Sequence, residues 1–242
     1  MKIIYVTIFL IIILILILFF LYYENILLNE KAIIFKNEIP SEIIEKFKVS
    51  NLILNHGDEK LNLLEYLNND PFNPKQYKKI QLKDFINNEE LKNNNSKKYQ
   101  IKFSFNEIKN NNLGSYFDDL IKYCQNKFNN NNFNFYPYVF RMSKNNWSFP
   151  NHFDCTDQIL CQLHGTRKII VNFNKKDTTY NLEPGDILFL PVNKYHYVTQ
   201  TNGNFNINFN LASNSKKSDS CSKEFDRIWK KQSKRCITNN CI

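Results

Sequence analysis

The sequence is poor in histidine and lacks the cysteine spacing of a zinc site. Only four histidines occur among its 242 residues, namely His56, His152, His164 and His196. No two of the six cysteines are separated by two residues, so their spacing does not indicate a zinc site. The sequence also contains no internal repeat, and we expect no second globular domain.

The N-terminus carries one unbroken apolar run over residues 3–23, in which Thr7 is the only clearly polar member. At about 1.5 Å per residue a helix of this length spans roughly 30 Å, the thickness of a bilayer core. A cleaved signal peptide is the alternative, but its apolar stretch is usually about 7–15 residues and ends in small residues. Here the run closes on Tyr22 and Tyr23, which suit the membrane interface. We therefore predict a single-pass membrane anchor over residues 1–24, with its orientation undecided.

The formal net charge is +9, and its densest basic stretch lies in the C-terminal residues 214–242. Contact with nucleic acid or with an anionic membrane is one interpretation of this stretch, and we favour the other, a solvated tail. Three of the six cysteines, Cys221, Cys236 and Cys241, also lie there. Disulfides among them would imply a lumenal or external domain, and the sequence leaves the redox compartment open.

Residues 25–133 have the pattern of a helical or mixed lead-in that packs on a β domain. The predicted elements are a short helix at 41–48 capped by Ser41, a strand followed by a helix at 77–92, and a core-packed helix at 115–128. Residues 61–67 form a further apolar segment. We expect loops around Pro71 and Pro74 and in the asparagine-rich stretches 93–96 and 129–133.

From residue 134 to residue 213 the pattern changes to short runs rich in Ile, Val, Phe and Tyr. Turn signals such as Pro184-Gly185-Asp186 separate them. Regularly spaced strands of this kind indicate a mainly β sandwich or barrel.

His152, Asp154 and His196 are the candidate metal ligands. On a strand, residues i and i+2 point to the same face, so His152 and Asp154 would share a face, with Phe153 on the other side. A barrel would then bring the strand of His196 alongside. Two histidines and a carboxylate form the facial triad of non-haem iron(II) oxygenases, although Zn²⁺ and Mn²⁺ suit the same ligands. An H-x-D pair alone also fits an ordinary surface histidine.

Three linked segments, HFDCTDQILCQLHGTRKIIVNF (152–173), LEPGDILFLPVNKYHYV (182–198) and NINF (206–209), set that pair in context. Together they resemble the JmjC and cupin-like family of Fe(II)/2-oxoglutarate oxygenases, including the five-residue step from Pro191 to His196. The resemblance covers roughly residues 134–212 and is nearest to the small protein- or RNA-hydroxylase branch. It implies a double-stranded β-helix of the jelly-roll type.

The resemblance assigns roles to further residues. His152, Asp154 and His196 would bind iron, and Arg167 would grip the far carboxylate of 2-oxoglutarate, where many relatives have lysine. Lys168 is the weaker candidate for that contact because it would face the other side of the strand. Asn208 would hydrogen-bond the co-substrate. Phe149 stands where relatives often carry Thr or Ser, and Pro150 beside it would shift the strand register.

The implied function is a membrane-anchored hydroxylase that uses O₂, Fe(II) and 2-oxoglutarate on a protein side chain or a modified RNA base. One alternative is a non-catalytic cupin-like module that serves as a membrane-tethered scaffold. Another is a metal-dependent isomerase or dioxygenase that needs no 2-oxoglutarate. For Gly185, Asp186 and Gln162 we expect structural roles in the barrel, and for His56 a place in a loop.

Overall fold

The computed structural model describes residues 9, 11–18, 31–67, 70–93, 97–101, 112–128, 141–143, 148–173, 176–192, 194–201 and 206–212. The described strands form two antiparallel sheets. The larger sheet has eight strands in the order β1-β10-β7-β12-β5-β4-β2-β3, and the smaller has four in the order β6-β11-β8-β9. Their bounds are β1 Ile33–Phe35, β2 Lys60–Leu67, β3 Asp70–Gln81, β4 Lys97–Ile101, β5 Arg141–Ser143, β6 Ser148–His152, β7 Gln158–His164, β8 Thr166–Phe173, β9 Lys176–Leu182, β10 Ile187–Leu190, β11 His196–Thr201 and β12 Asn206–Ala212.

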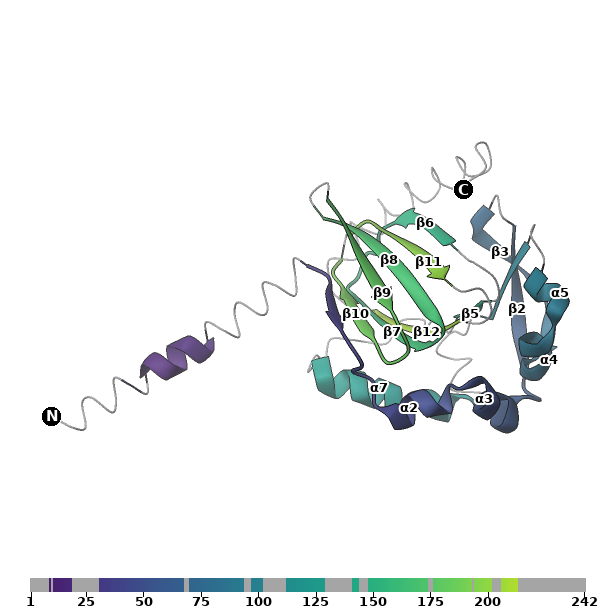
Figure 1. Cartoon of the computed structure of the whole chain (residues 1–242), viewed down its shortest axis with the longest axis horizontal. Helices are drawn as coiled ribbons and strands as arrows, with labels where there is room; N and C mark the ends of the chain where they lie inside the picture. The colour runs from purple at the N-terminus through teal and green to yellow at the C-terminus, as the bar shows by residue number, and fades with distance from the viewer. Residues whose placement is uncertain are drawn as a thin grey trace.

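The last eight of these strands, β5 to β12, are shared between the two sheets (Figure 1). Strands β5, β7, β10 and β12 lie in the larger sheet, and β6, β8, β9 and β11 form the smaller one. The chain therefore crosses from one sheet to the other several times, an arrangement compatible with a jelly roll. The prediction of a mainly β domain in this part of the chain is confirmed.

Alternate residues of these strands enter two separate apolar clusters. The inner cluster joins the two sheets and includes Leu160, Ile169, Val171, Leu188, Leu190 and Val198. The outer cluster includes Ile159, Cys161 and Leu163 of β7 and faces the helices. Because side chains alternate along a strand, the even-numbered residues of β7 share the face of the inner cluster, as do the odd-numbered residues of β8.

Five described helices belong to the lead-in segment, and the longest is α7. Their bounds are α2 Ser41–Lys46, α3 Val49–His56, α4 Leu82–Asn87, α5 Glu89–Asn93 and α7 Gly114–Phe128. In α7, Phe117, Leu120 and Cys124 are buried at helical spacing and belong to the outer cluster. The predicted core-packed helix at 115–128 is thus confirmed.

Two expectations for the lead-in segment, the Ser41 cap and the loop position of His56, were wrong, and a third is made more definite. Ser41 is the first residue of α2, whose N-cap is Pro40, and no side chain caps the helix. His56 lies in α3 and is buried, because its ring packs edge-on against the ring of Tyr116 at 4.4 Å. The apolar segment at 61–67 is part of strand β2.

Pro71 and Pro74 lie within strand β3 instead of the expected loop. Strand β3 is the last strand in the order of its sheet, and an edge strand tolerates proline because its outward amides need no partner in the sheet. Strands β2, β3 and β4 therefore extend the larger sheet, which the prediction of a segment that only packs on the barrel did not foresee.

Residues 11–18 are helical and expose their large apolar side chains. Among the described residues, no helix is long and apolar enough to cross a membrane. The anchor over residues 1–24 stays a prediction. The asparagine-rich stretch 129–133 and the basic tail 214–242 lie outside the described residues.

Candidate metal centre

Two histidines meet where strands β6 and β11 pair. His152 and His196 are opposite each other in the antiparallel register, and their ring centroids are 4.1 Å apart. The predicted pairing of the two histidine strands is therefore found. Between His196 and Val198 the register shifts, so that three residues of β6 span two of β11. Pro150 lies in this irregular stretch, as expected.

Asp154 reaches the same place from a loop. Strand β6 ends at His152, so the assumption that both residues lie on one strand was wrong for Asp154. Its Oδ2 is nevertheless 3.6 Å from His196 Nε2. Candidate ligand atoms of His152, Asp154 and His196 all lie within 4.8 Å of one another.

The loop that carries Asp154 is held at two points. The Phe153 ring is buried and packs edge-on against Tyr195, with centroids 5.1 Å apart. Asp157 Oδ1 accepts a hydrogen bond of 2.8 Å from the Val192 amide, which belongs to the segment leading into β11. These contacts join the loop of Asp154 to the strand of His196.

The hydrogen bond of His196 favours one tautomer. The residue is 3% exposed, and its Nδ1 lies 3.0 Å from the carbonyl oxygen of Lys194. A carbonyl oxygen only accepts, so Nδ1 carries the proton and donates it to this bond. The lone pair of Nε2, on the side of Asp154, is then available to a metal ion.

These three residues supply two imidazole nitrogens and one carboxylate oxygen. Such a set fits a divalent transition metal and leaves coordination positions open for other ligands. The same set accepts Fe(II), Mn²⁺ or Zn²⁺, so it defines a candidate metal centre without selecting the metal.

Arg167 lies in the interior beyond this centre. It is 4% exposed and occupies the face of β8 that also presents Ile169 and Val171 to the inner cluster. Val171 is opposite His196 in the register of β8 and β11. Arg167 therefore faces the same interior as His196. Along β8 it lies four residues, or about 13 Å, from Val171, the residue opposite His196. Lys168 is half-buried on the other face of β8, as its weaker candidacy anticipated.

Asn208 is a buried amide whose hydrogen-bonding groups have no partner among the described residues. It is opposite Gln162 in the register of β12 and β7, is 1% exposed, and makes no hydrogen bond through Nδ2 or Oδ1. Asn210, on the same face of β12, has an unsatisfied buried Oδ1. Buried amides without partners are costly, so this face of β12 is suited to a polar ligand. Asn208 was predicted from the sequence and Asn210 was not, although the two stand at i and i+2 on one strand.

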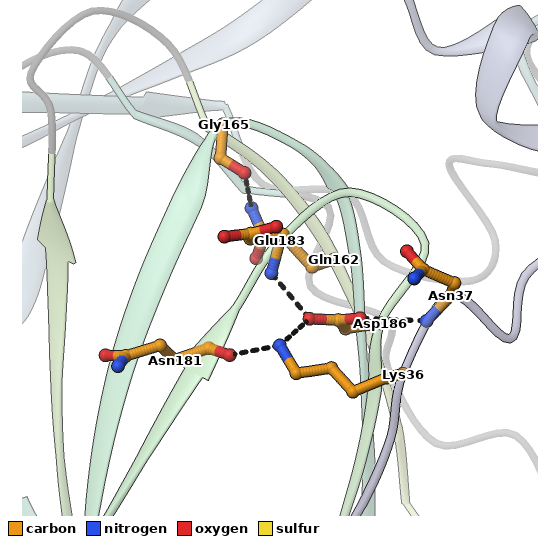
Figure 2. Close-up of polar contacts among 7 residues, drawn as sticks. All are labelled: Lys36, Asn37, Gln162, Gly165, Asn181, Glu183 and Asp186. Atoms are coloured by element: carbon orange, nitrogen blue, oxygen red, sulfur yellow. Dashed lines mark hydrogen bonds and ion pairs between the residues drawn. The ribbon is translucent and has the colours of Figure 1, made fainter.

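The turn before β10 is fixed by Asp186, as Figure 2 shows. Its carboxylate accepts hydrogen bonds from the amides of Asn37 (3.0 Å) and Glu183 (2.8 Å) and from Lys36 Nζ (2.6 Å). Gly185 in this turn has φ +101°, a conformation that favours glycine. The structural roles expected for Gly185 and Asp186 agree with these contacts.

Gln162 steadies the other turn, directly before Arg167. Its Nε2 donates to the carbonyl oxygen of His164 at 2.7 Å. It also donates to the carbonyl oxygen of Gly165 at 3.0 Å, as Figure 2 shows. Burial lowers the pKa of His164 in this turn, because it disfavours the charged imidazolium. Gln162 therefore braces the start of β8, which is the structural role expected from the sequence.

The described cysteines do not belong to the cluster of candidate metal ligands. Cys155 follows Asp154 and is disulfide-bonded. Cys124 and Cys161 are free, buried and 3.7 Å apart between their sulfurs. Their mutual hydrogen bond, followed by burial, raises the pKa of Cys161 well above its usual value. The Cys161 thiol is therefore not suited to act as a thiolate.

No family model and no curated protein matches this chain. Among solved structures it is similar to the Escherichia coli ribosomal oxygenase YcfD, with 13% identity and a TM-score of 0.49 over 84% of this chain and 54% of that one. A second structure of YcfD gives 12% identity and a TM-score of 0.48, covering 84% of this chain and 53% of that one. The chain thus spans about half the length of YcfD.

A cupin superfamily protein from Desulfitobacterium hafniense DCB-2 is similar at 16% identity, with a TM-score of 0.28, over 32% of this chain and 65% of that one. The solved structures to which this chain is similar thus include a ribosomal oxygenase and a cupin superfamily protein. They are of the kinds that the sequence motifs resemble. At these identities and TM-scores the likenesses say nothing about activity, which has to be judged from the residues of the centre.

Proposed function

We propose that this protein is an Fe(II)- and 2-oxoglutarate-dependent hydroxylase. The observation that carries the proposal is the position of Arg167, buried in the same interior as the cluster of His152, Asp154 and His196. A metal centre alone fits many enzymes. A buried guanidinium at a distance from the metal also fits a co-substrate with a negative charge at each end.

His152, Asp154 and His196 would hold iron(II). His196 would bind through Nε2, because its Nδ1 is engaged with the Lys194 carbonyl. When bound together, iron(II), 2-oxoglutarate and O₂ supply the hydroxylation of a C–H bond with release of succinate and carbon dioxide. The chain's own residues position these reactants and keep water out.

Arg167 and Asn208 would bind 2-oxoglutarate. A guanidinium pairs with a carboxylate through two parallel hydrogen bonds, which fixes the orientation of the diacid as well as its charge. The Arg167 side chain and the five-carbon diacid would together have to span the roughly 13 Å along β8. The unsatisfied amide of Asn208 would gain a partner from the same ligand. Ile169, Val171 and Val198 provide the apolar wall around it.

We further propose that residues 1–24 anchor the protein in a membrane. The exposed apolar side chains of residues 11–18 support this part, because such a surface is unfavourable in water. The substrate would be a protein side chain or a modified RNA base.

Turnover without substrate tests the enzyme proposal. Full-length protein in detergent micelles, supplied with Fe(II), ascorbate and 2-oxoglutarate, should release succinate. His152→Ala should abolish this release. Arg167→Ala should raise the KM for 2-oxoglutarate by about 10-fold to 100-fold, since a charged hydrogen-bonded pair contributes roughly 1.5–3 kcal/mol.

Lys168→Ala is the matched control, because Lys168 is the next residue on the same strand and faces the other side. It should leave the KM for 2-oxoglutarate unchanged. If metal-loaded protein releases no succinate, the scaffold alternative takes precedence. If turnover of another substrate proceeds without 2-oxoglutarate, the protein is a different enzyme of the cupin class.

A further inference from the structure

A basic groove lies at the end of the larger sheet. It has a volume of about 920 Å³ and is lined by residues of β2, β3 and α4, including Lys60, Lys78, Lys79, Gln81, Asp84 and Asn87. The three lysines are exposed, against the single carboxylate of Asp84. The ammonium groups of Lys60 and Lys79 have no carboxylate partner among the described residues, whereas that of Lys83, on the helix that follows β3, is paired with Asp58. The groove therefore carries uncompensated positive charge.

The same groove follows a sheet edge. Strand β3 pairs with β2 on one side, and no described strand pairs with its other side. The Leu82 amide donates to the Glu59 carbonyl at 3.0 Å, one step beyond the Lys60–Gln81 pair. Hydrogen-bonded and non-hydrogen-bonded pairs alternate along an antiparallel ladder, so the backbone groups of Lys79 and Gln81 point away from β2.

The positive charge of the groove and the outer edge of β3 together indicate which kind of partner would bind here. We propose that the edge of β3 at Lys79–Gln81 binds an extended acidic peptide of a partner protein, which adds to the sheet as a further strand. Its backbone would pair with Lys79 and Gln81, and its carboxylates would lie near Lys60 and Lys79. RNA has no backbone that continues a β ladder, and Asp84 in the lining disfavours a dense row of phosphates. Pro71 and Pro74 restrict pairing to the later half of the strand, because proline has no amide hydrogen.

Lysine and proline on an edge strand also have a simpler use, since both discourage unwanted pairing between sheets. The two explanations predict different results when an acidic peptide is added to the protein. Edge protection predicts no binding, whereas a docking site predicts binding that depends on salt, on the two lysines and on one backbone amide.

The test uses the full-length protein in detergent micelles, without added metal or 2-oxoglutarate, so that its result is independent of the proposed function. The probe is a fluorescein-labelled peptide of alternating glutamate and valine, followed by fluorescence anisotropy. A peptide of alternating lysine and valine and a single-stranded oligouridine of similar length are the comparison ligands. We expect saturable binding of the acidic peptide alone, weakened as salt is raised.

Two variants separate charge from backbone pairing. Lys60→Gln together with Lys79→Gln should weaken binding roughly 10-fold or more, because charge pairs at an interface contribute to both rate and affinity. Gln81→Pro removes one outward amide and suits the local backbone, whose φ is −68°. It should also weaken binding, with the charge unchanged.

The double substitution Lys122→Gln and Lys176→Gln is the matched control, since both lysines are exposed and lie outside the groove. It changes net charge by the same amount and should leave affinity within about twofold. Circular dichroism should show the same fold for all variants. Absence of binding, equal loss in the control, or tighter binding of the oligouridine would each overturn the proposal.

Discussion

At the scale of single residues, the Asp186 carboxylate shows how a buried charge is satisfied. It is 1% exposed and accepts bonds from two backbone amides and from Lys36, whose side chain is 52% exposed. Removing one partner of such a group is costly because the others lose their acceptor. The carboxylate thus joins the segment after β1 to the turn before β10.

Asp186→Asn should lower the free energy of unfolding by about 1–3 kcal/mol, since an amide keeps one oxygen acceptor and loses the charge. Asp186→Ala should cost more, because the amides of Asn37 and Glu183 then lose their side-chain acceptor. Denaturant unfolding of the full-length protein measures both. Lys36→Ala should cost less than either, since the ammonium is half in water. Equal losses in Lys36→Ala and Asp186→Ala would show that the ion pair, and not the amide bonds, dominates.

Residue-scale prediction succeeded where chemistry restricts the choice. With only four histidines, the H-x-D pair and the step from Pro191 to His196 left few ligand sets, and the described structure brings that set together. It failed where local context decides. The sequence placed Asp154 on a strand, although the chain leaves β6 at His152. Asn210 carried no motif, and only the alternation of β12 reveals that it shares a face with Asn208.

At the scale of elements, aromatic contacts hold helix α7 to the larger sheet, and that of Phe117 can be tested. Phe117 is fully buried, and its ring stacks on Phe209 of β12 with centroids 5.4 Å apart. Strand β12 also carries Asn208 on its opposite face. The packing of α7 therefore supports the strand that forms part of the proposed co-substrate site.

Phe117→Ala should lower the free energy of unfolding by about 3–5 kcal/mol, the usual cost of removing a buried phenyl ring. Thermal or denaturant melting of the full-length protein provides the measurement. Asp118→Ala, the next residue and an exposed one, is the control and should change stability by less than about 0.5 kcal/mol. A loss below about 1 kcal/mol for Phe117→Ala would mean that α7 contributes little to the fold.

Elements were predictable where their hydrophobic period was clear. The spacing of Phe117, Leu120 and Cys124 identified α7, and the short runs rich in Ile, Val, Phe and Tyr identified β7, β8, β10 and β12. The first part of strand β3 was mistaken for a loop because of Pro71 and Pro74, whereas its end was correctly predicted as a strand followed by a helix. Those prolines are compatible with a strand only at a sheet edge, and whether a strand lies at an edge depends on distant parts of the chain.

At the scale of the whole molecule, the centre depends on pairings between segments far apart in the sequence. Strand β11 lies between β6 and β8, so His196 is next to His152 on one side and Val171 on the other. Neither neighbour follows from local periodicity, and the family resemblance was needed to anticipate the first. A metal bound to both His152 and His196 would therefore link two strands of the smaller sheet and oppose unfolding of the whole domain.

This linkage gives a prediction that does not rely on activity. Anaerobic Fe(II), or Mn²⁺ as a stable substitute, should raise the melting temperature of the full-length protein in detergent. A metal at 100 times its Kd adds about 2.7 kcal/mol, which corresponds to roughly 5–10 °C for a domain of this size. His152→Ala should remove most of the shift, because it leaves two of the three ligands. His164→Ala is the control, since His164 is outside the cluster, and should keep the shift. A melting-temperature shift of the same size in His152→Ala would show that the metal binds elsewhere. This centre would then no longer support the oxygenase proposal.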